Sequence, residues 1–209
     1  MSKRKKPLPD DSQGFSRRSF LKGAGVAATG TTVLSSGLLG YAAEPPSRVI
    51  GPGVTDATLT VNGAAKHLSI EPRTTLAEAL RDELHMTGTK IVCDRGSCSA
   101  CTVLLDGMPV NSCMTFALDA VGRKITTIEG LGDPAHLHPV QAAFVEHDGM
   151  QCGYCTPGMV MSCAALLDRN PNPTAADVQQ AISGNICRCG TYPKVVEATL
   201  AAAHSGKGA

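Results

Sequence analysis

The chain has 209 residues, a formal net charge of +1 and 43% hydrophobic residues, which is enough apolar material for one or two small domains. Aromatic residues make up only 3% and tryptophan is absent, so the cores must be built from small and aliphatic side chains. Residues 1–43 carry seven basic and two acidic residues, which leaves a net charge of −4 on the rest and excludes a broad basic surface for nucleic acid.

The first 43 residues predict a signal for export to the periplasm. The run S-R-R-S-F-L-K at residues 16–22 resembles a twin-arginine signal, and an apolar stretch to Leu39 is followed by small residues at Gly40 and Ala42. An uncleaved membrane anchor or an accidental Arg-Arg pair is the alternative, but a stretch rich in glycine and threonine makes a poor membrane span. The twin-arginine pathway exports folded proteins, so a cofactor can be inserted before export.

After a linker at 44–55, residues 56–132 predict a small α+β domain of the β-grasp kind. Residues 58–61 and 66–70 form a predicted hairpin around the turn Asn62-Gly63. Thr75 and Glu78 predict the capping box of a helix. Residues 102–110 predict a second hairpin, and residues 125–128 predict one more strand.

Residues 133–209 predict a domain of four helices. The first ends near Gly149, the second spans 158–167, the third runs from Thr174 to about Ile182, and the fourth spans 195–203. The second is apolar nearly all round and should be buried. Four helices in this order predict a small bundle that brings the two helix–helix connections to one end.

Eight of the nine cysteines fall into two sets of four. The first set has the spacing C-x4-C-x2-C with a later fourth cysteine, which is typical of plant-type 2Fe–2S ferredoxins: Cys93, Cys98, Cys101 and Cys113. The second set consists of two close pairs: Cys152 with Cys155, and Cys187 with Cys189. Zinc or disulfides are the alternatives for these sets. Cys163 lies within the apolar helix and is expected to be a buried structural thiol.

With both sets placed, the chain resembles the iron–sulfur subunits of the xanthine oxidase family of molybdenum hydroxylases, most of all those of periplasmic aldehyde oxidoreductases. The matching runs include C-D-R-G-S-C-S-A-C-T-V, I-T-T-I-E-G-L-G, Q-C-G-Y-C-T-P-G and G-N-I-C-R-C-G. The resemblance covers roughly residues 56–205. It implies one 2Fe–2S cluster on each cysteine set, the first nearer the flavin and the second nearer molybdenum.

The resemblance also implies partners and further contacts. A large subunit would carry the molybdenum cofactor, a medium subunit would carry FAD, and Gln151 and Cys189 would approach the pterin. The sequence departs from the family pattern at Val92 and Ser99, where glycine is usual. If either residue has a positive φ, its side chain costs about 1–2 kcal/mol.

The sequence contains no phosphate-binding glycine loop, G-x-S-x-G or H-E-x-x-H motif, so the substrate site is expected on a partner. The histidines at 136, 138 and 147 are expected to be structural or interface residues. The sequence therefore predicts an electron-transfer subunit of a molybdenum-dependent aldehyde oxidoreductase. The alternatives are the same role in an N-heterocycle hydroxylase or a carbon monoxide dehydrogenase, a free-standing exported electron carrier, and a zinc-binding interaction module.

Overall fold

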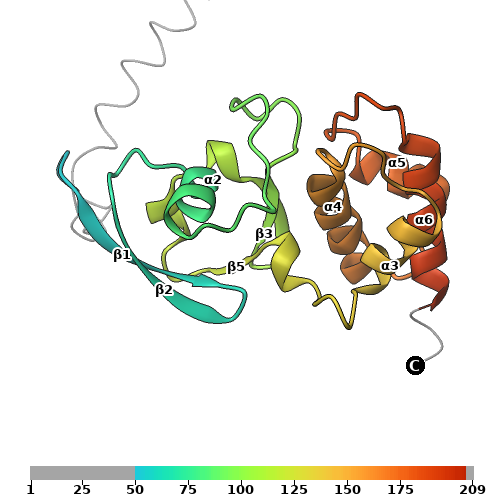
Figure 1. The fold of residues 1–209 in the computed structure, drawn as a ribbon, viewed down its shortest axis with the longest axis horizontal. Coiled ribbons are helices and arrows are strands. Elements are labelled where there is room, and N and C mark those ends of the chain that lie inside the picture. The colour runs from blue at the N-terminus through green and yellow to red at the C-terminus, as the bar shows by residue number, and fades with distance from the viewer. Residues whose placement is uncertain (1–49, 206–209) are drawn as a thin grey trace, which may run out of the picture. The chain divides into compact units, whose positions relative to one another are not determined.

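The computed structural model describes residues 50–205 (Figure 1). The predicted signal at 1–43 and the first half of the predicted linker, residues 44–49, lie outside these residues. The described part combines a mixed five-stranded sheet with helices, so the fold class is α+β. Between residues 50 and 205, no helix is both long enough and apolar enough to cross a membrane.

The first hairpin consists of β1 (Thr55–Val61) and β2 (Ala64–Ile70), which pair antiparallel. The turn between them is the predicted Asn62-Gly63, and both residues have the positive φ, +50° and +79°, that a type I′ turn requires. Alternate residues of β1 face inward, with Ala57, Leu59 and Val61 buried. The hairpin prediction is thus confirmed, and the strands extend a little beyond it.

The predicted capping box at Thr75 and Glu78 is present and begins α2 (Leu76–Glu78). The chain then continues as a π-helical turn over Ala79–Glu83, a wider winding that the sequence pattern did not predict. This helical segment buries Leu76 and Leu80 against the sheet. The guanidinium of Arg81 donates hydrogen bonds to the carbonyls of Thr87 and Thr89, which fixes the approach to the first cysteine loop.

The second predicted hairpin is formed by β3 (Thr102–Leu105) and β4 (Met108–Asn111), and the last strand is β5 (Lys124–Thr126). The sheet order is β2-β1-β5-β3-β4, with β5 parallel to β1 and antiparallel to β3. All four residues of β3 are buried, because this strand has neighbours on both sides and is covered by α4. Short 3₁₀ turns follow at three places: Ser112–Met114, Ala117–Ala120 and Ile128–Gly130.

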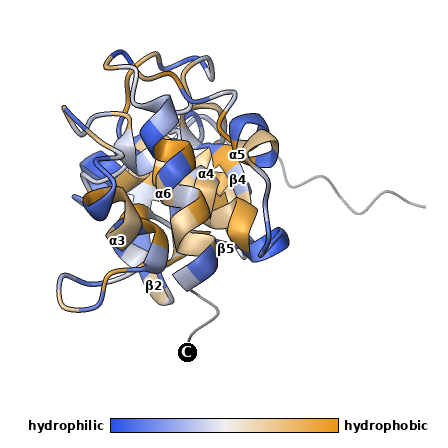
Figure 2. Ribbon diagram, turned by 90° about the vertical axis from the view of Figure 1, so that its right-hand side faces the viewer, coloured by the Kyte–Doolittle hydropathy of each residue, from blue (hydrophilic) through white to orange (hydrophobic). Residues whose placement is uncertain are grey.

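Four helices make up the C-terminal half: α3 (Pro139–Glu146), α4 (Thr156–Arg169), α5 (Ala175–Ala181) and α6 (Tyr192–Ser205). Every residue of α4 from Gly158 to Leu166 is buried, and its ribbon is apolar along much of its length (Figure 2). The helices share one core around Phe144, Met159 and Val195. The four helix predictions are confirmed, as is the burial of the second.

Helix α4 also joins the helices to the sheet. Met161 and Ala165 of α4 pack with Leu104 of β3 in a small separate core. Since α4 contributes to both this core and that of the helices, the loops at its N-terminal end are held close to the loop that precedes β3.

Candidate metal centres

The first four cysteines come together from three places in the chain. Cys93 and Cys98 lie on the loop before β3, Cys101 directly precedes β3, and Cys113 lies in the 3₁₀ turn after β4. Pairing of β3 with β4 brings Cys101 and Cys113 together, because Thr102 is opposite Asn111. Three of the thiols are buried and Cys93 is half-buried. The set therefore has one more accessible side, at Cys93.

Backbone amides of the loop are directed at these sulfur atoms. The N–H of Gly96 donates to Cys113 Sγ at 3.4 Å, and the N–H of Ser97 donates to Cys93 Sγ at 3.3 Å. The loop can turn its amides inward because Asp94, Gly96 and Ser99 all have left-handed φ angles, +52°, +70° and +51°. Amides in such positions stabilise thiolates and tune the potential of a bound cluster.

The two departures from the usual glycine pattern differ structurally. Ser99 is left-handed, so the expected strain falls on this residue, whereas Val92 is not among the left-handed residues of 50–205. The Val92 side chain is 56% exposed and meets no backbone penalty of this kind. The conditional cost of a positive φ therefore applies to Ser99 alone, because the chain at Val92 does not need glycine.

The second set of cysteines lies at the N-terminal end of α4 and in the connection between α5 and α6. Cys155 is the residue that precedes the first turn of α4, and Cys152 lies three residues earlier. Cys187 is buried, whereas Cys152 and Cys189 are exposed. The hydroxyl of Thr191 lies 3.3 Å from Cys187 Sγ, and the N–H of Cys187 donates to the Tyr192 hydroxyl at 2.8 Å.

Within each set the thiols approach one another in pairs. One thiol of each pair has a pKa that its neighbour helps to shift: Cys93 with Cys98, Cys113 with Cys101, Cys155 with Cys187, and Cys189 with Cys152. In the described part of the chain, no three or more His, Cys, Asp or Glu side chains are grouped around a point that suits a single metal ion. A 2Fe–2S cluster needs a different arrangement of ligands, because each of its two irons binds two thiolates. Two pairs of thiols in each set fit this arrangement.

The thiols differ in their readiness to ionise. Burial raises the pKa of Cys113 to about 11 and that of Cys155 to about 12. The backbone hydrogen bond from Arg95 lowers the pKa of Cys93 to about 7. Burial acts to raise the pKa of Cys187, but hydrogen bonds led by those of Thr191 outweigh it and bring the pKa to about 7. A bound cation deprotonates coordinating thiols outright, so such a donor set fits iron.

The loops that carry the two sets are hydrogen-bonded to each other. The N–H of Ile186 donates to the carbonyl of Cys98 at 3.0 Å. The amide side chain of Asn185 donates to the carbonyl of Ser99, also at 3.0 Å. A Cβ on Gly158 of α4 would lie 2.3 Å from the Ser99 oxygen, so only glycine permits this approach. Sequence reasoning missed these residues, although the G-N-I-C-R-C-G run contains Asn185 and Ile186.

The remaining predicted residues lie as follows. Gln151 is exposed, next to the exposed Cys152. Cys163 is fully buried in α4, and burial raises its pKa to about 11. The ring of His138 accepts the N–H of Val140 at the start of α3, and the ring of His147 lies 3.3 Å from a carboxylate oxygen of Glu197 in α6. These two histidines thus have structural roles.

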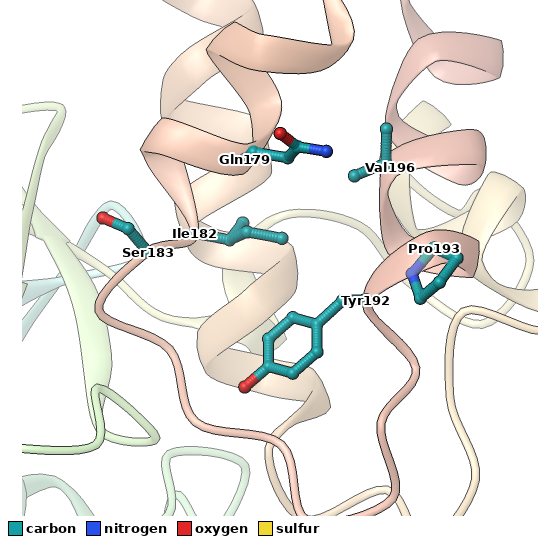
Figure 3. A pocket seen from close by; sticks show the side chains of 6 residues that line it. All are labelled: Gln179, Ile182, Ser183, Tyr192, Pro193 and Val196. Atoms are coloured by element: carbon teal, nitrogen blue, oxygen red, sulfur yellow. The ribbon is translucent and has the colours of Figure 1, made fainter.

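A groove of about 470 Å³ lies between α5 and the beginning of α6 (Figure 3). Gln179, Ile182 and Ser183 line one side, and Tyr192, Pro193 and Val196 line the other. The groove contains no cysteine. Its connection to the second set is through Tyr192, whose ring lines the groove and whose hydroxyl accepts from Cys187.

Comparisons with known proteins agree with this geometry. Residues 59–124 match the family of 2Fe-2S iron-sulfur cluster binding domains, and residues 127–200 match the 2Fe-2S binding domain family. Residues 14–33 match the twin-arginine translocation pathway signal sequence, which indicates export.

Relatives of known identity match over most of the chain. The aldehyde oxidoreductase iron-sulfur-binding subunit PaoA of Escherichia coli K12 is 44% identical over 200 residues, covering 88% of this chain and 86% of the relative. The nicotine 6-hydroxylase small subunit of Paenarthrobacter nicotinovorans is 48% identical over 140 residues, covering 67% of this chain and 84% of the relative. A chain of quinoline 2-oxidoreductase from Pseudomonas putida 86 superposes with a TM-score of 0.71 at 40% identity, covering 74% of this chain and 96% of that one.

Proposed function

The chain belongs to the iron–sulfur subunits of the xanthine oxidase family of molybdenum hydroxylases, and we propose that it serves an exported aldehyde oxidoreductase. As a member of this family it is the electron-transfer subunit of an oxidoreductase complex. Its proposed role is to relay electrons from a molybdenum cofactor on a large partner subunit to FAD on a medium subunit or to an external acceptor.

The proposed ligands are the eight paired cysteines. One 2Fe–2S cluster would be held by Cys93, Cys98, Cys101 and Cys113, and the other by Cys152, Cys155, Cys187 and Cys189. The pairwise approach of the thiols and the amides that point at Cys93 and Cys113 support this assignment. Each cluster, when bound, accepts and releases one electron at a time. The hydrogen bond between Ile186 and Cys98 is the observation that carries the relay role, because it joins the two ligand loops directly.

The finer description of the fold belongs to the same proposal. The strand order β2-β1-β5-β3-β4 with one parallel pair supports a β-grasp domain at 56–132. The core shared by α3, α4 and α6 supports a four-helix bundle at 133–209. The proposed signal peptide (1–43) and linker (44–55) precede them, and a twin-arginine signal supports a periplasmic location.

The proposed contacts with the molybdenum subunit lie on the exposed side of the second set. Gln151, Cys152 and Cys189 are all exposed there, so a pterin carried by a partner could reach Gln151 and Cys189. The flavin subunit would bind on the other side, near Cys93, which is the most accessible thiol of the first set.

The aldehyde substrate is supported by the length of the match to PaoA. That match spans 200 residues, whereas the match to the nicotine hydroxylase subunit spans 140. The match to the quinoline enzyme favours a second candidate, an N-heterocycle hydroxylase with the same relay.

The decisive experiment uses the native complex purified from the export compartment. It is mixed anaerobically with an aromatic aldehyde, and the EPR spectrum is recorded beside a sample reduced with dithionite. We expect two distinct reduced 2Fe–2S signals with the aldehyde. Signals that appear only with dithionite would refute the aldehyde assignment and lead to N-heterocycles as the next substrates. A colourless complex without either signal would refute the iron–sulfur assignment itself and favour zinc.

A further inference from the structure

Asn185 is a buried amide whose polar groups are all occupied. It is only 4% exposed, and it is the one amide side chain among the buried polar residues of the range 50–205. Its Oδ1 accepts from the Ser162 hydroxyl at 3.0 Å, and its Nδ2 donates to the Ser99 carbonyl at 3.0 Å. Because a carbonyl can only accept, the nitrogen must be the atom that faces Ser99. Burial of an amide is costly unless its hydrogen bonds are made, so this arrangement is strongly specified.

The main chain of Asn185 is bound as well, on the side of the second cysteine set. Its N–H donates to the Ile182 carbonyl at 2.9 Å, and its carbonyl accepts from the Tyr192 hydroxyl at 3.1 Å. The same hydroxyl accepts the N–H of Cys187 at 2.8 Å. A short hydrogen-bonded chain therefore runs from Cys187 through Tyr192 to Asn185.

The partners of Asn185 belong to different parts of the fold. Ser99 follows Cys98 in the first loop, Ser162 lies on α4, and Tyr192 begins α6. The neighbouring bond from Ile186 N–H to the Cys98 carbonyl gives a second connection at the same place. Positions 185 and 186 thus bind positions 99 and 98, and this pair of bonds is the inter-loop clamp.

The Ser99 carbonyl accepts hydrogen bonds from both domains. Ser99 is held at φ +51°, and its carbonyl also accepts from the N–H of Thr102 at 3.3 Å and the hydroxyl of Thr102 at 2.7 Å. Both of these donors belong to the first domain. Asn185 supplies the side-chain donor from the second domain, and Gly158 lies directly beside the same carbonyl.

We propose that Asn185 is the positioning residue that sets the separation, and hence the electronic coupling, of the two metal centres. This inference rests on the proposed cluster ligands. Ser162 provides a matched control: Ser162→Ala removes the bond to Oδ1 but leaves the bond from Asn185 to Ser99. Asn185→Ala removes both.

The test compares wild-type, Asn185→Ala and Ser162→Ala chains in the assembled complex, fully reduced with dithionite. Low-temperature EPR reports the magnetic splitting between two reduced clusters, which falls steeply with their separation. A loss of splitting in Asn185→Ala, with two spins per chain retained and the splitting unchanged in Ser162→Ala, is the expected result. Rapid-freeze samples should also show slower transfer between the clusters in Asn185→Ala alone.

Unchanged splitting and an unchanged transfer rate in Asn185→Ala would overturn the proposal, as would an equal loss in Ser162→Ala. If Asn185→Ala does not retain two spins, Asn185→Asp takes its place, because it keeps the shape and the acceptor for Ser162 while losing the donor to Ser99. Normal splitting in Asn185→Asp would then refute the proposal. A wild-type complex without two 2Fe–2S signals would instead refute the cluster assignment, so the two failures are distinguishable.

Discussion

The backbone amide of Ile186 donates a hydrogen bond to the carbonyl oxygen of Cys98, with 3.0 Å between nitrogen and oxygen. Ile186 precedes Cys187 and has a side chain that is 57% exposed, so solvent reaches this position from one side. The bond nevertheless joins Cys98 of the first set to the residue that precedes Cys187 of the second. Loss of either metal centre should therefore change the stability of the other cysteine loop.

We predict that the Ile186 amide exchanges slowly in the complete protein and rapidly after iron is removed with a chelator under reducing conditions. Neither cysteine loop has regular secondary structure to hold it without its ligated metal. Exchange should accelerate by roughly tenfold or more, the factor expected when a hydrogen bond worth about 1.4 kcal/mol is lost. Hydrogen-exchange mass spectrometry measures this, with the β1–β2 ladder as the internal control. An unchanged rate at Ile186 would show that the inter-loop clamp is independent of metal.

We predict that Cys98→Ala and Cys163→Ala have opposite consequences for the metal content, although both cysteines are buried. Cys98→Ala should lose the EPR signal of the first cluster and abolish turnover with acceptors that take electrons through the flavin. Cys163→Ala should keep both signals, because Cys163 is buried within α4 and is not one of the eight paired cysteines, and should cost about 1 kcal/mol of stability. Iron analysis of the two purified complexes checks this. Flavin-linked turnover that survives Cys98→Ala would contradict the proposed direction of electron flow.

Local rules of the sequence predicted most of the fold. The Asn62-Gly63 turn and the capping box at Thr75 depend on neighbouring residues, so their signals are complete within a few positions. The burial of α4 could also be predicted from the sequence, because apolar residues occur on all sides of this helix. The wider winding at Ala79–Glu83 was missed because a π-helical turn has no distinct apolar period.

The contact between the cysteine loops could not be predicted in the same way. Asn185 and Ser99 are 86 residues apart, and nothing in either local sequence indicates the other. From the sequence alone, Gly158 is an ordinary and slightly unfavourable helix residue. Its role becomes visible only in the structure, where the Ser99 carbonyl lies beside it. The cysteine spacing predicted thiolate ligands, but the arrangement of the two sets depends on long-range packing of α4 against β3.

Gly158→Ala should destabilise the protein, in contrast to the usual effect of replacing glycine with alanine in a helix. The usual effect is a gain of up to about 1 kcal/mol. Here the added methyl would lie 2.3 Å from the Ser99 oxygen and 3.1 Å from the Ala100 Cα, both backbone atoms that cannot turn aside. Overpacking of this kind costs about 1–3 kcal/mol. Thermal unfolding of the complete protein measures the difference, and Gly51→Ala, where a Cβ meets nothing within 4 Å, is the control. A raised Tm for Gly158→Ala would show that α4 is free to move away from the first loop.

The two positions that depart from the family's glycine pattern should respond oppositely when glycine is restored. Ser99→Gly removes the strain of a left-handed φ, which is about 1–2 kcal/mol. It also costs about 0.5–1 kcal/mol, because glycine loses more backbone entropy on folding. Its Tm should therefore be equal to or slightly above that of the wild type, with the hydrogen bond from Asn185 to the carbonyl retained.

Val92→Gly has no such strain to relieve, so only the entropic loss remains and stability should fall by about 0.4–1 kcal/mol. Comparison of the two variants by thermal unfolding, with iron content measured in each, tests the assignment of strain to Ser99. Equal losses at both positions would mean that the Ser99 side chain makes a compensating contact. One candidate is a contact with the backbone at Gly184, where an added Cβ would lie 3.2 Å from Ser99 Oγ. If Ser99→Gly lost more stability than Val92→Gly, that contact would be stabilising. Its loss would then cost more than the relief of backbone strain at Ser99 gains.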